Sequence, residues 1–201
     1  MVAKIVLALA YEPPTGETTQ EPLCIAAGGS HRVLTQRGRA TQLIDSVLSL
    51  CAHPGARLTI LDQDVNSLTP ACAAALRARI AVLPALGGLI SYLNAWENIT
   101  LPIGFNQPAR LPHIGHTVLD LIAGFGLEPH AMLRKMPSEL SPYERTVAAW
   151  VRVILESPDL VLGEPVAPAL PPGLTAFGFY EAYHASHREG TFIQLEEISQ
   201  T

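Results

Sequence analysis

The sequence LSPYERTVAAWVRVILESPDLVLGEP, residues 140–165, decides the fold of this chain. Ser141 and Glu144 stand three residues apart with a proline just after the serine, which predicts a capping box at the start of a helix. The helix is expected to run to Glu156. The apolar run LVL that follows, at 160–162, predicts a buried strand. A helix that leads directly into a buried strand indicates an α/β domain.

Strand and helix signals alternate along the rest of the chain. Further strands are expected at Lys4–Tyr11, Arg57–Leu61, Ile80–Leu83 and Thr191–Leu195, with two short apolar pieces in Leu23–Leu34. Further helices are expected at Thr41–Cys51, from the cap Thr69-Pro70 onward, near Val118–Gly124 and at Phe177–His187. Strands separated by helices predict parallel pairing in an α/β sheet.

Composition narrows the class of protein. Apolar residues make up 48% of the 201 residues and charged residues 15%, which excludes a disordered chain. The net charge of -5 gives no basic footprint for nucleic acid. Three scattered cysteines suit a reducing compartment rather than a disulfide framework. No apolar run reaches the ~18 residues of a membrane-spanning helix, and the apolar start of the chain is interpreted as a buried strand.

The opening segment resembles the signature helix and following strand of the ATP-binding subunits of ABC transporters. Those proteins carry Leu-Ser-Gly-Gly-Glu/Gln, a helix with an arginine, an apolar strand and Asp-Glu-Pro. Leu140, Ser141, Glu144, Arg152 and Glu164 fit that pattern.

The resemblance covers about 4–165, and it implies a P-loop NTPase-like, ABC ATPase-like α/β fold. A parallel-sheet core with an antiparallel N-terminal β part and a small helical subdomain is expected, in a C-terminally truncated chain. The single domain 1–201 would then consist of a core at about 1–84 and 157–201 and a helical subdomain at about 85–156.

The resemblance places the phosphate-binding loop in RVLTQRGRATQLIDSVLSL. The working loop reads G-x-x-x-x-G-K-[ST]: its amides cradle the phosphates, its lysine reaches the β/γ oxygens and its hydroxyl holds Mg²⁺. Aligned on the helix, Leu34 and Arg39 take the two glycine positions, Ala40 the lysine and Thr41 the hydroxyl. Only Thr41 keeps its type, and Gly38 preserves part of a turn. Arg39 also has a plain interpretation as a solvated loop residue.

Other nucleotide-contacting positions are altered as well. The glutamine that contacts Mg²⁺ and the attacking water corresponds to Ala85, and the aspartate before the catalytic glutamate to Gly163. Glu164 stands at the catalytic glutamate, as a vestigial residue or a plain strand-end carboxylate. Tyr11 matches the aromatic that stacks on adenine, or packs at a strand end.

The signature keeps its serine, Ser141, but Pro142-Tyr143 replace the two glycines whose amides bind the γ-phosphate. The capping box retains the helix start while the phosphate contact is expected to be lost. Two histidine pairs, His113-x-x-His116 and His184-x-x-His187, have no further ligands close in sequence, so no metal site is expected.

The piece GGLISYLNAWENI, residues 87–99, resembles the segment that meets the transporter's membrane subunit, most closely in ATPases of MCE-type lipid transporters. The partner-binding residues expected there are Leu89, Ile90, Tyr92 and Trp96. Their alternative role is to pack the helical subdomain.

These observations predict a non-hydrolysing subunit or regulator on a membrane permease, in lipid transport, peripheral to the inner membrane on the cytoplasmic side. No cofactor is expected. The chain would pair with itself or with an intact ABC ATPase. Two alternatives stay open: an ATP-hydrolysing subunit with a divergent phosphate loop, which would bind ATP and Mg²⁺, and an autonomous scaffold or binding protein.

Overall fold

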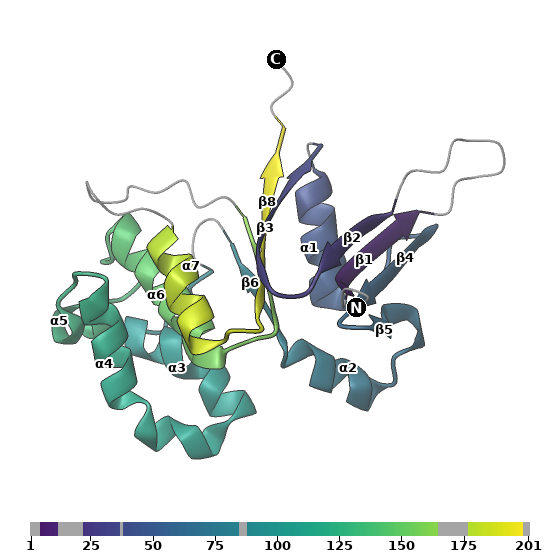
Figure 1. The fold of residues 1–201 in the computed structure, drawn as a ribbon. Coiled ribbons are helices and arrows are strands. Elements are labelled where there is room, and N and C mark those ends of the chain that lie inside the picture. Colours follow the sequence, from purple (N-terminus) through teal and green to yellow (C-terminus); the bar gives the residue numbers. More distant parts are fainter. Residues whose placement is uncertain (1–4, 12–21, 37, 85–87, 165–176, 199–201) are drawn as a thin grey trace. The chain divides into compact units, whose positions relative to one another are not determined.

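The computed structural model describes residues 5–11, 22–36, 38–84, 88–164 and 177–198. The chain divides into two compact units (Figure 1). Unit 1 comprises Met1–Val82, Asp159–Leu162 and Arg188–Thr201, and unit 2 comprises Leu83–Pro158 and Gly163–His187. Unit 2 thus includes residues 163–187 in addition to the stretch at about 85–156 expected for a helical subdomain.

An antiparallel sheet in unit 1 has the strand order β2-β1-β4-β5. Its strands are β1 (Ile5–Tyr11), β2 (Leu23–Ala26), β4 (Ala56–Ile60) and β5 (Gln63–Asp64). β1 pairs antiparallel with both β2 and β4, and β4 with β5. This sheet confirms the antiparallel N-terminal part of the expected fold.

A second sheet has the order β3-β8-β7-β6. It consists of β3 (Gly29–Thr35), β8 (Thr191–Glu197), β7 (Leu160–Gly163) and β6 (Ile80–Leu83). β3 and β8 are parallel and in register from Gly29↔Thr191 to Thr35↔Glu197. All four residues of β7 are buried, as the apolar run at 160–162 predicts.

Helix α1 (Arg39–Ser49) joins the two sheets in one core because it carries an apolar stripe. Leu43, Ile44 and Val47 share a face at helical spacing, and they pack with Leu58 of β4 and Ile193 of β8. The remaining helical elements of unit 1 are η1 (Val65–Ser67) and α2 (Pro70–Arg77). Thr69 caps α2 by accepting a hydrogen bond from Cys72 N, as the Thr-Pro sequence predicts.

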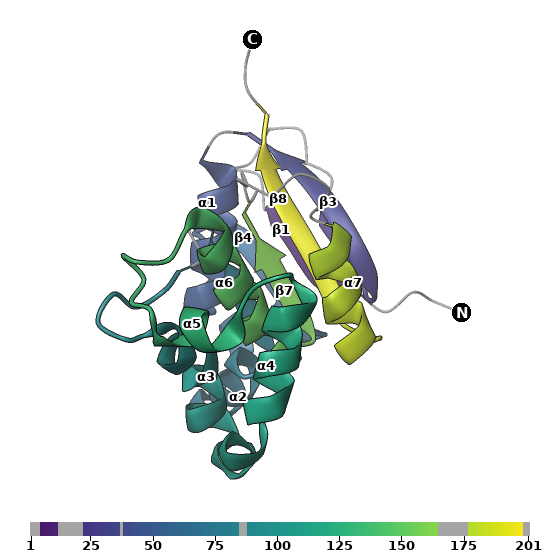
Figure 2. The same ribbon diagram turned by 90° about the vertical axis from the view of Figure 1, so that its left-hand side faces the viewer.

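Unit 2 is built around α6 (Pro142–Glu156), which contacts α3, α4 and α7 (Figure 2). The other elements are α3 (Ala95–Asn106), η2 (Pro108–His113), α4 (Gly115–Gly124), α5 (Pro129–Arg134) and α7 (Phe177–Ser186). Trp150 of α6 is buried and stacks on Phe179 of α7, with ring centroids 5.3 Å apart. The tryptophan is therefore a core residue of this unit.

Candidate functional site: a candidate nucleotide site and an ordered surface segment

The connection between β3 and α1 lies where the sequence predicts the phosphate-binding loop. β3 continues to Thr35 and α1 begins at Arg39, so only residues 36–38 lie between them. Leu34, aligned with the first glycine of the loop, is a strand residue that lies opposite Glu196 of β8. The working loop has four residues between its glycines, and they wrap around the phosphates. The connection here is shorter, with three residues outside the strand and the helix.

The start of α1 is held by a carboxylate of the chain itself. Gly38 takes the N-cap position with φ 79°, in the left-handed region that glycine tolerates. Its amide donates a hydrogen bond to Glu197 Oε1 at the end of β8, with a nitrogen–oxygen distance of 2.6 Å. An anionic ligand at a helix N-terminus would use such amides, because they carry the positive end of the helix dipole. Here the amide of Gly38 is already bonded to the carboxylate of Glu197.

The side chains at the start of α1 differ from those of the working loop. Arg39 and Thr41 are exposed, whereas Ala40 is 5% exposed and belongs to the hydrophobic core. A lysine at position 40 would therefore point its stem into the core and would have to bury or redirect its charge. The only lysine in the described part of the chain, Lys135, forms an ion pair with Glu144, with Nζ and Oε1 2.6 Å apart.

The signature position keeps a helix cap without its glycines. Ser141 Oγ accepts a hydrogen bond from Glu144 N, and Glu144 Oε2 accepts one from Ser141 N, so the predicted capping box is confirmed. Tyr143 is 8% exposed, and its hydroxyl donates to the carbonyl of Phe125 at 2.7 Å. The residue that replaces the second glycine is thus part of the core of unit 2.

The ionisation of Glu144 follows from these contacts. Burial on its own raises the pKa of this carboxyl. The hydrogen bonds from Lys135 and from Ser141, together with the charge of Lys135, outweigh burial, so the pKa lies below its ordinary value. Glu144 is therefore a charged capping residue, and both of its oxygens are engaged.

The remaining candidate positions are only partly described. Glu164 follows β7, and its amide donates to the carbonyl of Leu83 at 3.0 Å. Tyr11 ends β1 opposite Ala56, and its side chain lies outside the described residues. Ala85 also lies outside them. Across the described ranges, no three His, Cys, Asp or Glu residues gather as a metal site would require.

The expected partner-binding segment is fixed by a buried asparagine. Asn98 of α3 is 1% exposed, and its Oδ1 accepts a hydrogen bond from Ile90 N at 2.7 Å. Its Nδ2 donates to the carbonyls of Ile90, Leu93 and Asn94 at 3.1, 2.8 and 3.0 Å. One side chain therefore sets the path of the chain from Ile90 to Asn94.

This path leaves one aromatic ring in solvent. Tyr92 is 77% exposed, whereas Leu89, Ile90 and Trp96 are half-buried. A second link comes from α6, where Arg152 Nη1 donates to the carbonyl of Gly88 at 3.1 Å. The segment is thus held at Gly88 and again at Ile90–Asn94, with Tyr92 between them.

Sequence reasoning missed several residues of these sites. Glu197 has no signal of its own, because its contact with Gly38 joins residues 159 positions apart. Asn98 gave a weak signal as a polar residue in an apolar stretch. Phe105, at the end of α3, is 80% exposed, and no pattern in the sequence predicts this exposure.

Solved structures of ABC ATP-binding proteins are similar to this chain in fold. The solved structure of the ATP-binding cassette MJ0796, bound to ADP and Pi, matches with a TM-score of 0.67 at 15% identity, over 95% of this chain and 88% of that one. Clostridium perfringens cbiO1, part of the ABC transporter complex cbiONQ, matches with a TM-score of 0.68 at 13% identity, over 97% of this chain and 79% of that one. The chain therefore has the fold of an ABC transporter ATP-binding subunit.

Sequence comparison finds similarity to ATP-binding proteins of methionine import. The methionine import ATP-binding protein MetN of Xanthomonas campestris pv. campestris is 28% identical over 155 residues, which are 77% of this chain and 45% of that protein. MetN 2 of Pseudomonas aeruginosa is 24% identical over 155 residues, 77% of this chain and 46% of its own length. The chain thus spans less than half the length of these curated relatives. No family model matches it.

Proposed function

We propose that this chain is a non-hydrolysing, ABC-ATPase-like subunit or regulator that docks on a membrane permease. The observation that carries the first half of the proposal is the three-residue connection between β3 and α1. Without the cradle and its lysine, the electrostatic stabilisation of a transferred phosphoryl group is missing. Glu164 alone does not replace the cradle and the lysine.

The docking half of the proposal is supported by the segment 88–96. A fixed backbone that presents an exposed tyrosine fits an interface anchor, because tyrosine offers a large contact area with little conformational entropy to lose. None of the described helices is long and apolar enough to cross a bilayer. Membrane association would then run through a permease, with the chain peripheral to the inner membrane on its cytoplasmic side.

The likeness of residues 87–99 to ATPases of MCE-type lipid transporters extends the proposal to a lipid permease. The similarity to methionine import proteins supports the alternative that the transported substrate is an amino acid. The chain would act as a homodimer or beside an intact ABC ATPase, and the proposal includes no cofactor.

An ATP-hydrolysing transporter subunit is the second candidate function. It is favoured by the similarity to import ATP-binding proteins and by the retained Glu164 and Ser141. An autonomous scaffold is a third candidate, and it predicts that no permease co-purifies. Nucleotide binding distinguishes the non-hydrolysing subunit from the ATP-hydrolysing subunit. Co-purification with a permease distinguishes both of them from an autonomous scaffold.

Millimolar MgATP is expected to leave the melting temperature of the purified protein unchanged, with no phosphate release above background. A ligand at ~100 times its dissociation constant would add ~2.7 kcal/mol to the free energy of unfolding, a shift of a few degrees that differential scanning fluorimetry detects. An upward shift with MgATP, together with phosphate release that Glu164→Gln abolishes, would establish the hydrolysing alternative.

Tyr92→Ala is expected to abolish co-purification with the permease while the melting temperature stays within about 1 °C of the parent, because the ring is 77% exposed. Phe105→Ala is the matched control: it removes an aromatic ring that is 80% exposed on the same unit but outside the segment. Equal co-purification of the parent and Tyr92→Ala, measured from detergent extracts, would contradict docking through this segment.

A further inference from the structure

A hollow of about 530 Å³ opens in unit 1 at the amino-terminal ends of the strands of the β3-β8-β7-β6 sheet. Each strand contributes a residue that precedes it: Gly28 before β3, Arg79 before β6, Asp159 before β7, and Arg188 with Glu189 before β8.

The hollow is separate from the degenerate phosphate site. Gly38, at that site, lies beyond the carboxyl end of β3, and the seven residues of this strand span about 23 Å. The phosphate-loop position that the resemblance implies therefore lies outside the hollow.

Hydrogen bonds and one ion pair connect the residues at the rim of the hollow before any ligand binds. Arg79 Nε donates to Asp159 Oδ2 at 2.5 Å, and Thr191 N donates to the carbonyl of Asp159 at 2.9 Å. The hydroxyl of Thr191, a residue with no exposed surface, accepts a hydrogen bond from Gly28 N at 2.8 Å. These contacts join the starts of four strands, so a ligand would meet a formed site with little ordering cost.

Arg188 and Glu189, which carry charges of opposite sign, lie beside these contacts at the rim of the hollow. Arg188 and Glu189 are exposed and belong to the turn before β8. Over the described ranges, neither side chain makes a hydrogen bond or ion pair. With the Arg79–Asp159 pair, the lining carries two cations and two anions.

The rest of the lining is apolar. Val6 is 2% exposed and Leu61 is 8% exposed, and both line the hollow. A bound anion would leave Glu189 without a counter-charge, and a bound cation would leave Arg188 without one. A molecule that carries both charges and a small apolar group would match the whole lining.

We propose that this hollow binds a small zwitterion of the amino-acid type. Arg188 and the outer nitrogens of Arg79 receive its carboxylate, Glu189 receives its ammonium group, and Val6 and Leu61 contact its side chain. The volume falls within the ~300–1,000 Å³ that is usual for small-molecule pockets. The inference is independent of the proposed docking function.

The test is a ¹⁵N NMR titration of the whole chain with L-leucine and with two analogues that each lack one charge, 4-methylpentanoate and 3-methylbutylamine. Leucine is expected to shift the amide signals of Gly28, Glu189 and Thr191 saturably. Each analogue is expected to bind at least about tenfold more weakly, because one charge-assisted hydrogen bond is lost.

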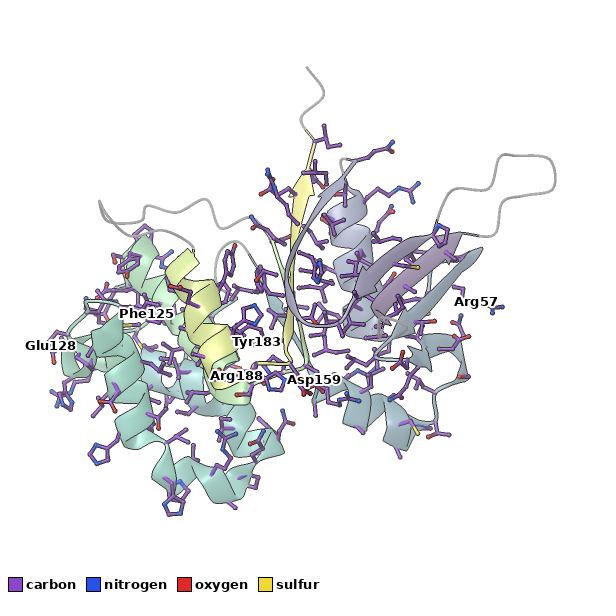
Figure 3. All side chains as sticks on the ribbon, viewed as in Figure 1. Arg57, Phe125, Glu128, Asp159, Tyr183 and Arg188 are labelled. Atoms are coloured by element: carbon purple, nitrogen blue, oxygen red, sulfur yellow. The ribbon has the colours of Figure 1, made fainter. Side chains whose placement is uncertain are left out.

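Two variants and one control complete the experiment. Arg188→Gln and Glu189→Gln are each expected to weaken leucine binding about tenfold without altering the fold, because both residues are exposed. Arg57→Gln is the control, since Arg57 is an exposed arginine of β4 that Figure 3 shows well apart from Asp159 and Arg188.

The proposal is overturned by any of three results. The first is the absence of saturable shifts at these amides up to about 50 mM leucine. The second is an equal response to leucine and both analogues, and the third is an equal loss of binding in Arg57→Gln and Arg188→Gln. Neither the MgATP result nor the co-purification result bears on these outcomes.

Discussion

Asn98→Leu is expected to lower the free energy of unfolding of unit 2 by about 2–4 kcal/mol and to release the segment that it fixes. Leucine matches asparagine in size but makes no hydrogen bonds. The carbonyls of Ile90 and Asn94 keep backbone partners, Leu93 N and Asn98 N. Ile90 N and the carbonyl of Leu93 lose the partner that Asn98 supplies, and each such loss costs about 1–3 kcal/mol.

Urea denaturation and amide hydrogen exchange together test this expectation. Exchange at Ile90 is expected to accelerate, because its amide loses the 2.7 Å contact with Asn98 Oδ1. Asn106→Leu is the matched control, an exposed asparagine of the same helix, and it is expected to change stability by less than about 0.5 kcal/mol. Equal stability losses in the two variants would mean that Asn98 does not hold the segment.

The same substitution connects stability to docking. If Tyr92 serves as an anchor, its value depends on the fixed backbone beneath it, since ordering a loose segment on binding costs free energy. Asn98→Leu should then weaken co-purification with the permease although the tyrosine itself is unchanged. Loss of docking in both Asn98→Leu and Tyr92→Ala, with only Asn98→Leu destabilised, would show that Asn98 positions the segment and that Tyr92 contacts the permease.

Local patterns in the sequence were sufficient for most elements of the fold. The capping box at Ser141 and the apolar run at 160–162 predicted α6 and β7, and both are confirmed. The stripe of Leu43, Ile44 and Val47 predicted α1. In each case the signal lies within a few residues of the element that it specifies.

Helix α3 was not predicted, because Pro102 interrupts its sequence and apolar residues surround much of the helix. A local signal was present all the same. Asn94 and Glu97 form a capping box, with Asn94 Oδ1 accepting from Glu97 N and Glu97 Oε2 accepting from Asn94 N. The spacing Asn-x-x-Glu is the same cue that correctly placed α6.

The candidate nucleotide site could be only partly predicted from the sequence. Alignment identified which residue types are absent, but it assumed a loop of ordinary length. The length follows from how far β3 extends, and the parallel register with β8 carries β3 to Thr35. The contact of Gly38 with Glu197 depends on the same register. Pairings between distant segments leave no local trace in a single sequence.

Stability is expected to fall by about 3 kcal/mol between about pH 4.5 and pH 7 through Glu156 alone. Burial raises the pKa of this carboxyl to about 7, and the charge of Arg152 lowers it only in part. In this window the folded chain holds a proton on Glu156, whereas an unfolded chain with the ordinary pKa of 4.5 has released it. The free energy of unfolding therefore decreases as the pH rises, and the decrease ends above pH 7.

Glu156→Gln keeps the shape of the neutral side chain and removes its titration. The variant is expected to match the parent near pH 4.5 and to exceed it by up to about 3 kcal/mol at pH 8, measured by urea denaturation across the range. Glu181→Gln, an exposed glutamate of α7, serves as the control and should follow the parent at every pH.

His184 changes the free energy of unfolding with pH in the direction opposite to Glu156. Burial and the neighbouring His187 lower its pKa, so its contribution to stability rises with pH. The difference between Glu156→Gln and the parent cancels this background, because His184 is present in both chains. A difference that stays constant from pH 4.5 to pH 8 would show that the pKa of Glu156 is not raised in the folded protein, with the charge of Arg152 offsetting burial.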